Sequence, residues 1–229
     1  MTPSGTYRTM CTVTRRYPEC VPRVGPSRVR ALEDIVVLPC RSPLHGELER
    51  ALAAASRLHK MKTDLRRVPV RVTSTISEAG AYRYRRANPI DLRVSSRSGH
   101  TATGFLHELA HLIDHQLHYD RRTRAWASAV HPAFARWRLA VARLERRPFP
   151  GGSHRQRYFV SAQEVWARAY AQTVLVRSAD PLLLDQLARL QETNEPQVWP
   201  PDVFEPVALQ VELVFELLGL TQLELPIAA

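Results

Sequence analysis

Cysteine is scarce in this chain. Three cysteines occur in 229 residues, Cys11, Cys20 and Cys40, and none stands in a C-x-x-C pair or beside a histidine partner. An odd number without paired spacing argues against a disulfide framework. We therefore expect the protein to work in a reducing compartment, that is, in the cytoplasm, unless it is released by a route that reads no signal peptide.

Long apolar runs are also missing. Residues 1–20 contain no apolar segment of signal-peptide length. No uncharged apolar run approaches the roughly 18 residues that a membrane-spanning helix needs. The sequence therefore predicts no membrane span. Its 45% hydrophobic and 24% charged residues are typical of a globular rather than a disordered chain.

Acidic residues are few relative to basic ones. The chain has 22 Asp and Glu against 32 Lys and Arg, which gives a formal net charge of +10. A surface of this sign attracts polyanions such as nucleic acid, anionic lipid or acidic protein. No nucleic-acid-binding motif accompanies the charge. We therefore expect no more than a weak nucleic-acid contact through the basic surface.

The residue pattern predicts one domain with an appendage. Residues 1–42 are rich in Pro, Arg, Ser and Thr and lack clear periodicity, which is typical of a loose basic arm. Within the arm, residues 36–38 are candidates for a short strand. Residues 43–229 are long enough for one sizeable core. We therefore place the arm at 1–42 and the domain at 43–229.

Hydrophobic periodicity in that domain predicts an α+β fold, mainly helical with a small sheet. Helical spacing predicts helices over 43–62, 101–118, 122–145 with a break at Pro132, 158–175, 181–190 and 203–218. Alternating apolar residues predict strands over 68–72, where Pro69 favours an edge position, and over 90–95. An exposed edge on the second strand would let an extended peptide dock. Residues 147–157 read as a flexible loop.

The helix predicted over 122–145 should contribute to the core. Its apolar residues at helical spacing are the candidates for burial. They are Trp126, Val130, Phe134, Trp137, Leu139 and Val141.

The stretch 101–118 carries the strongest chemical signal. It contains His107, Glu108 and His111 in the arrangement H-E-x-x-H. An α-helix turns about 100° per residue, so the two histidines lie one turn apart on one face and can bind one zinc ion. Glu108 then lies beside the metal, where its carboxylate can deprotonate a water. The alternative is a helix whose histidines are ordinary hydrogen-bonded imidazoles.

The apolar residues of the same stretch are spaced to bury a different side of that helix. They are Phe105, Leu109, Leu112, Ile113 and Leu117.

A catalytic zinc usually has three protein ligands and an open position, so one ligand remains to be found. His118 lies about 10 Å along the helix axis from His111, too far to share its metal. His115 can pair with His111, but that choice leaves Glu108 without a role. We therefore expect the third ligand to come from another part of the chain.

Glu164 is the first candidate, because a carboxylate on a second helix can face the first across a cleft. The same residue can instead close a capping box with Ser161 or pair with Arg168 four residues on. His154 and Asp114 are the competing candidates. Asp114 is better suited to orient a ligand than to be one.

Two segments, HELAHLIDH at 107–115 and QEVWARAYA at 163–171, resemble the zincin metallopeptidases of the gluzincin type. They are similar in particular to the catalytic domains of anthrax-lethal-factor-like proteases and to zincin-like domains of phages and mobile elements. Those families show an H-E-x-x-H-x-x-D helix followed by an E-x-F-A-x-A-F helix. His107, Glu108, His111, Asp114 and Glu164 occupy matching positions here. The resemblance covers roughly residues 88–175.

The resemblance has implications for the fold and the site. It implies a zincin-like domain with a small sheet packed beside the active-site helix, and it makes Glu164 the third zinc ligand. Trp166 replaces the usual Phe of the second motif. Lethal-factor-like members use a Tyr shortly before that Glu, and Tyr158 lies in a comparable place. Tyr158, or failing it His154, would then stabilise the oxyanion.

We therefore expect a zinc-dependent metallopeptidase that hydrolyses a protein or peptide substrate. In it, Zn²⁺ is held by His107, His111 and Glu164, and Glu108 is the general base. Two other functions remain open. One is a catalytically silent zincin-like binding module of a phage or mobile element, and the other is a DNA-associated basic protein.

Overall fold

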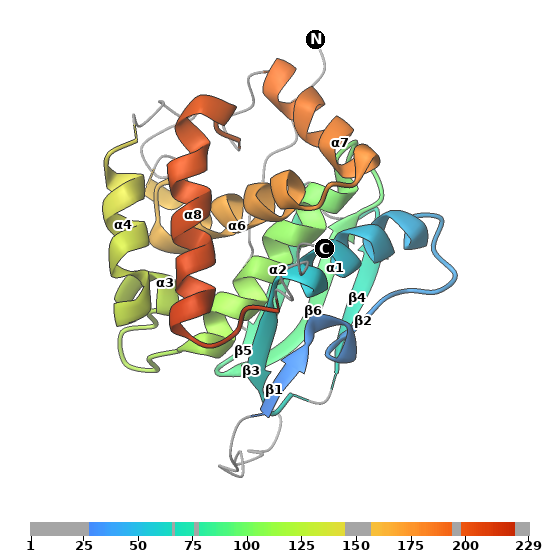
Figure 1. Ribbon diagram of the computed structural model, residues 1–229. Coiled ribbons are helices and arrows are strands. Elements are labelled where there is room, and N and C mark those ends of the chain that lie inside the picture. The colour runs from blue at the N-terminus through green and yellow to red at the C-terminus, as the bar shows by residue number, and fades with distance from the viewer. Residues whose placement is uncertain (1–27, 66, 76–77, 145–156, 194–197, 223–229) are drawn as a thin grey trace, which may run out of the picture.

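Helices and two small sheets make up the described part of the chain (Figure 1). The computed structural model describes residues 28–65, 67–75, 78–144, 157–193 and 198–222. Helices predominate over the strands, so the predicted α+β class is confirmed. Among these residues, no helix has the length and apolar character needed to cross a membrane.

The larger sheet has four strands in the order β2-β4-β6-β5. Strands β2 (Val36–Val37), β4 (Val68–Thr73) and β6 (Asn88–Ser95) are parallel, whereas β5 (Gly80–Arg85) runs antiparallel to β6. The prediction that the strand over 90–95 offers an edge is wrong, because β4 and β5 flank it. The edge strands are β2 and β5, and β5 was not predicted from the sequence.

Strand β4 is also interior, so the edge position predicted from Pro69 is wrong. Pro69 pairs with Val37 of the two-residue strand β2. The ladder between β4 and β6 begins only at Val70, which pairs with Leu92. Proline is tolerated at this point because the missing N–H precedes the longer ladder.

The segment predicted as a loose arm over 1–42 is folded from Arg28 onward. Strand β1 (Arg28–Ala31), the short helix η1 (Leu32–Asp34) and β2 follow one another there, and the short strand predicted at 36–38 is β2. Leu32 and Ile35 have no solvent exposure. Apolar burial therefore fixes a segment whose composition suggested disorder.

Helix α1 (His45–Leu58) is shorter than the predicted helix over 43–62. Residues Lys60–Thr63 form β3 instead, which pairs antiparallel with β1. The N–H of Lys60 also donates to the carbonyl of Leu220 at 2.7 Å. These distant partners satisfy the backbone hydrogen bonds of β3. The helical spacing over 43–62 carries no information about them, so the strand could not be predicted from it.

Helix α2 (Thr101–Leu117) lies at the centre of the molecule. It packs against β5 and β6 on one side and against α1 and α6 (Ala162–Arg177) on others (Figure 1). Every residue from Thr101 to His115 is buried. The expected apolar side is therefore buried, and so is the side that carries the histidines.

The helix predicted over 122–145 is broken, as Pro132 indicated. It consists of α3 (Ala127–Val130), the short helix η2 (Pro132–Phe134) and α4 (Ala135–Ala142). Trp126, Phe134 and Trp137 are buried as predicted, and Val141 is partly buried. Val130 and Leu139 are exposed, so their predicted burial is wrong.

Two helices close the described part of the chain, as predicted. Helix α7 (Pro181–Glu192) begins at Asp180, whose carboxylate accepts from the N–H groups of Leu182 and Leu183. Helix α8 (Pro201–Leu217) packs against α4 and α6. Gly219, at a φ of 65°, ends it in the left-handed conformation that glycine adopts without steric cost.

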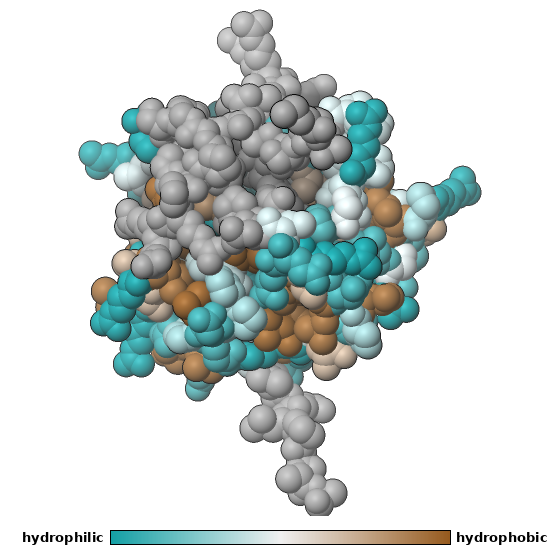
Figure 2. Space-filling view, turned by 90° about the horizontal axis from the view of Figure 1, so that it is seen from above, coloured by the Kyte–Doolittle hydropathy of each residue, from teal (hydrophilic) through white to brown (hydrophobic). Residues whose placement is uncertain are grey.

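Exposed apolar side chains do not form one continuous patch on the face seen in Figure 2. Brown groups are separated there by hydrophilic ones. Most of the large apolar residues that are exposed lie on α4, α7 and α8, such as Leu139, Leu182 and Leu209. Scattered exposure of this kind is usual for globular proteins.

Candidate metal centre

His107, His111 and Glu164 converge on one point inside the molecule. The two Nε2 atoms of the histidines are 3.2 Å apart. Glu164 places Oε2 at 3.3 Å from Nε2 of His107 and Oε1 at 3.2 Å from Nε2 of His111. All three side chains are buried, at no more than 7% exposure. One ligand atom from each lies within 4.8 Å of the others.

Local sequence explains this convergence. The i, i+4 spacing on α2 stacks the two imidazoles one turn apart, with their rings nearly perpendicular at 86°. Glu164 lies in the first turn of α6, where the hydroxyl of Ser161 accepts from its N–H at 3.5 Å. This is half of the capping box that the sequence allowed. The Glu164 carboxylate, which would complete it, faces the histidines instead.

Burial and the mutual attraction of the three side chains have opposite effects on their pKa values. Burial raises the pKa of Glu164, but the two histidines outweigh burial and hold it well below its usual range. Burial lowers the pKa of His107, and Glu164 only partly offsets that effect. Burial also opposes the charged form of His111, yet Glu164 raises its pKa above the usual value. An ionised carboxylate therefore stabilises positive charge at this point.

The residues fit a zinc ion. Tetrahedral zinc with bonds of about 2.0–2.1 Å separates its ligand atoms by about 3.3–3.4 Å. The two Nε2 atoms are 3.2 Å apart, close to this value, and each lies 3.2–3.3 Å from a different oxygen of Glu164, Oε2 for His107 and Oε1 for His111. A neutral imidazole and a carboxylate each present a lone pair, and lone pairs crowded this closely repel unless a cation or a proton lies between them. Two nitrogens and one oxygen form a donor set that suits zinc.

Glu108 is buried beside this cluster and is not part of it. Its carboxyl is 1% exposed, and Oε2 has no hydrogen-bond partner among the residues that the structure describes. Burial, offset in part by His111, raises its pKa to about 8. A carboxylate held in this way takes up a proton readily near neutral pH.

Gly80 at the start of the edge strand β5 makes room for Glu108. A Cβ at position 80 would lie 2.6 Å from Cγ and 2.8 Å from Oε1 of Glu108. The missing Cβ at Gly80 therefore lets β5 pass this close to the Glu108 side chain without displacing it. Our sequence reading missed Gly80, although a glycine that opens a strand is a known sign of close backbone approach.

Gly80→Ala should therefore displace the Glu108 carboxylate without removing any proposed metal ligand. We expect zinc content to stay unchanged and peptide hydrolysis to fall at least roughly tenfold, because a shift of about 1 Å at a catalytic group can cost about 10²-fold. Metal analysis and initial rates measure the two effects. Gly46→Ala is the matched control, since nothing lies within 4 Å of its added methyl. Equal activity of the two variants would contradict this role of Gly80.

Asp114 is on α2 and binds Ser128 of α3 through both of its carboxylate oxygens. Its Oδ1 accepts from the N–H of Ser128 and its Oδ2 from the hydroxyl of Ser128, both at 2.6 Å. Burial raises the pKa of Asp114 to about 7. Nδ1 of His111 has no hydrogen-bond partner in the described part of the chain. Asp114 therefore anchors α3, and no hydrogen bond from it orients His111 as the sequence suggested.

Ser128→Ala should destabilise the fold, because it leaves Oδ2 of the buried Asp114 without its donor. The expected loss in the free energy of unfolding is about 1–3 kcal/mol. Urea denaturation measures it. Thr123→Ala is the control, because its hydroxyl donates to Asp120 at 2.7 Å in an exposed turn. We expect a loss of about 0.5 kcal/mol or less for that variant. A smaller loss for Ser128→Ala than for Thr123→Ala would refute the anchoring role.

The other histidines of this region lie outside the cluster. Nε2 of His115 donates to the carbonyl of Arg86 at 3.0 Å, and Nδ1 accepts from the hydroxyl of Tyr82 at 2.7 Å. Burial lowers the pKa of His115 to about 4. His118 is exposed after the end of α2. These observations agree with the spacing argument against His118, and with setting His115 aside because it would leave Glu108 without a role.

Trp126 forms part of the wall of the cluster. Its ring meets that of His111 edge to face, at 5.5 Å and 83°. The sequence placed Trp126 in the core, and the structure adds that this packing fixes the imidazole plane of a candidate ligand. No sequence signal distinguished it from the other buried tryptophans.

Tyr158 is half-buried and lies one turn before α6, where its carbonyl accepts from the N–H of Ser161. Its phenol lies near the guanidinium of Arg168, whose pKa it helps to raise against the larger effect of burial. Arg168 donates to the backbone carbonyls of Glu164 and Phe159. His154 lies outside the described residues, as does most of the loop predicted over 147–157.

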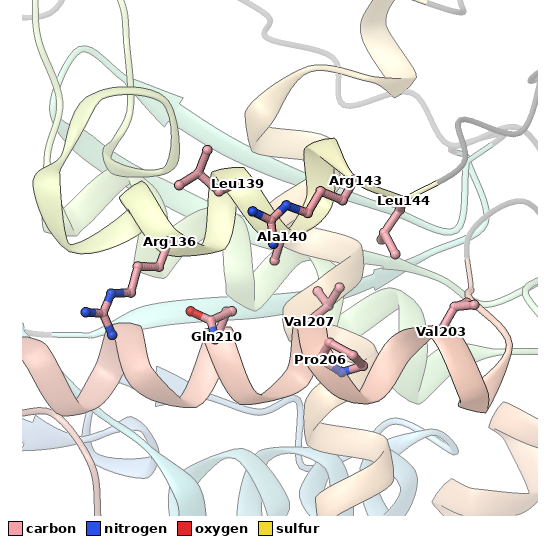
Figure 3. Close-up of a pocket in the computed structure, with 9 residues that line it drawn as sticks. All are labelled: Arg136, Leu139, Ala140, Arg143, Leu144, Val203, Pro206, Val207 and Gln210. Atoms are coloured by element: carbon pink, nitrogen blue, oxygen red, sulfur yellow. The ribbon is translucent and has the colours of Figure 1, made fainter.

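A separate groove of about 490 Å³ lies between α4 and α8 (Figure 3). Leu139 and Val207 contribute to its lining, with Arg136 and Arg143 among the polar residues around it. None of the residues of the candidate metal centre lines this groove. We therefore assign it no part in the chemistry of the cluster.

Comparisons of the chain with protein-family models, curated proteins and solved structures find no match.

Proposed function

We propose that this protein is a zinc-dependent metallopeptidase of the gluzincin type, with a zincin-like fold. The observation that carries the proposal is the buried convergence of His107, His111 and Glu164, whose ligand atoms lie within 4.8 Å of one another with the two Nε2 atoms 3.2 Å apart. The H-E-x-x-H helix and the resemblance of the two motifs support the same reading. The substrate is then a protein or peptide.

Zinc bound by these three residues supplies Lewis-acid activation of a water molecule and of the peptide carbonyl. Glu108 accepts the proton of the attacking water and passes it to the departing amine. The burial of its carboxyl and its raised pKa of about 8 suit a group that must take up a proton and give it back. Burial of the whole cluster keeps bulk water from screening these charges.

Strand β5 is the proposed docking edge for the substrate. It forms the end of the sheet order, and its first residue, Gly80, touches Glu108. An extended peptide can add to such an edge through main-chain hydrogen bonds. Added there, it would pass beside Glu108 and the metal ligands. This arrangement favours an unfolded segment or loop as substrate, since a helix cannot pair with a strand.

Tyr158 is the proposed oxyanion donor. It is half-buried, and it precedes Glu164 on the segment that leads into α6. Its phenol lies near the Arg168 guanidinium, which itself donates to the backbone carbonyl of Glu164. Donors of this kind contribute on the order of 10²–10³ in rate.

A peptide-cleavage assay tests the proposal. The zinc-loaded protein is incubated with a mixture of unstructured peptides, and mass spectrometry identifies the new termini. We expect cleavage at peptide bonds that stops with a zinc chelator and returns with added Zn²⁺. A protein that binds zinc stoichiometrically but cuts none of the peptides would favour the catalytically silent module instead.

A further inference from the structure

Three arginines converge on one carboxylate in the larger sheet. The Nε atom of Arg71 lies 3.1 Å from Oδ2 of Asp91, and Nη1 of Arg83 lies 3.5 Å from the same oxygen. Nε of Arg93 lies 3.5 Å from Oδ1. The three arginines come from β4, β5 and β6, respectively. Three guanidinium groups against one carboxylate leave a net charge of +2 at this point.

These side chains lie on the face of the sheet that is turned away from α2. Tyr82 and Tyr84 of β5 both pack against His115 of α2, so they lie on the helix side. Arg83 stands between them in the strand and therefore points to the opposite side. Its ion pair with Asp91 places Arg71 and Arg93 there as well.

Solvent reaches the guanidinium groups but hardly reaches Asp91. The Asp91 side chain is 3% exposed, whereas those of Arg71, Arg93 and Arg83 are 63%, 30% and 25% exposed. The buried carboxylate therefore orients the arginines and leaves donor groups on the outside. A guanidinium has five N–H donors, so its contact with Asp91 leaves others to bind an anion.

The pairing of the strands sets the spacing of these charges. Arg71 and Arg93 are direct partners in the ladder between β4 and β6. Neighbouring strands are about 4.8 Å apart, so the arginines form a row across three strands rather than a single point. Thr73, next on the same face of β4, adds a hydroxyl that is hydrogen-bonded to Thr75. Arginine and threonine side chains are common donors to nucleic-acid phosphates.

We propose that this face, defined by Arg71, Arg83 and Arg93 around Asp91, binds the phosphate backbone of a nucleic acid. A row of fixed cations fits a linear polyanion, and the net charge of +10 draws such a partner toward the molecule. A membrane surface fits less well. Val37 of β2 is the one large exposed apolar residue on the described strands of this sheet, at 37% exposure, which is too little apolar surface to insert into lipid.

The inference does not depend on the proposed peptidase activity. The metal ligands lie on α2 and α6, on the other side of the sheet from the arginines. Binding here requires no base contacts, so it should be insensitive to sequence and strongly dependent on salt. A nucleic acid bound there would lie on the opposite side of the sheet from the candidate metal centre.

Fluorescence anisotropy with a labelled DNA duplex tests the inference in the full chain. Binding is measured between about 50 and 200 mM salt for the native protein and for Arg71→Ala/Arg93→Ala. We expect the double variant to bind at least roughly tenfold more weakly at the lower salt. Its plot of log affinity against log salt should be less steep by about 2, because two phosphate contacts are lost.

The matched control is Arg121→Ala/Arg122→Ala, which removes the same charge from an exposed turn. We expect it to leave the slope nearly unchanged. Arg71→Lys/Arg93→Lys should keep most of the binding, because the charges remain. If the double alanine variant does not fold, as judged by circular dichroism, Arg71→Ala alone should reduce the slope by about 1.

Two results would overturn the inference. The first is an equal loss of DNA binding in the arginine-face variant and in the turn variant, since net charge alone would then explain binding. The second is absence of DNA binding by the native protein. Vesicles of phosphatidylserine and phosphatidylcholine are tested in parallel. Binding to them that depends on Arg71 and Arg93, without DNA binding, would assign the face to a membrane instead.

Discussion

Glu108→Gln should abolish peptide hydrolysis and leave zinc binding intact. The amide has nearly the shape of the carboxylate but cannot accept the proton of the attacking water. General-base catalysis of this kind contributes about 10²–10⁴ in rate, so we expect a loss of that size in kcat/KM. The metal ligands are untouched, and zinc content should match that of the native protein. Initial rates and metal analysis on the same preparation measure both.

Glu78→Gln is the matched control for this prediction. Glu78 is buried at 8% exposure, and its charge contributes to the raised pKa of Glu108, but we assign it no step in the reaction. We expect its effect on the rate to be less than roughly tenfold, the size of a modest pKa change. Two results would count against Glu108 as the base. One is an E108Q variant with nearly native turnover, and the other is a loss as large in Glu78→Gln.

His111→Ala should lose the metal and, with it, all activity. It leaves one imidazole and one carboxylate, which is too few ligands for a tight zinc site. We expect zinc to fall well below one equivalent after dialysis. Thermal unfolding should also show that the variant no longer gains stability from bound zinc. A ligand at about 1,000 times its Kd stabilises the folded state by about 4 kcal/mol, so chelation should lower the Tm of the native protein and leave that of the variant unchanged.

His115→Ala is the control on the same helix, one turn further along. Nε2 and Nδ1 of His115 are committed to Arg86 and Tyr82, away from the cluster. This variant should be less stable, since it removes the hydrogen bonds of His115 with the Tyr82 hydroxyl and the Arg86 carbonyl. It should nevertheless keep one equivalent of zinc. Loss of metal from His115→Ala but not from His111→Ala would mean that the ligand set is wrong.

The part of the site that depends on one helix could be predicted from the sequence. The positions of His107, Glu108 and His111 follow from helix geometry alone, because their spacing fixes which side chains share a face. Glu164 was less certain. Its neighbour Ser161 gave it an equally good local role as a capping residue, and only the packing of α6 across α2 shows which way the carboxylate points.

The parts that depend on distant partners could not be predicted. Residues 60–62 continue the helical pattern of α1 and become strand because β1 and the segment around Leu220 supply hydrogen-bond partners. Strand β5 was missed because it alternates Tyr82 and Tyr84 with arginines rather than aliphatic with polar residues. The arginines there face solvent and the tyrosines face α2, which tertiary packing decides.

The central claim is that three side chains hold one zinc ion, and a crystal structure of the zinc-loaded protein tests it most directly. Anomalous diffraction at the zinc edge locates the ion. We expect one buried zinc ion, with Nε2 of His107 and of His111 at about 2.0–2.1 Å and a Glu164 oxygen at about 2.0–2.2 Å. An ion held elsewhere, or an ion at this site without Glu164 among its ligands, would contradict the account.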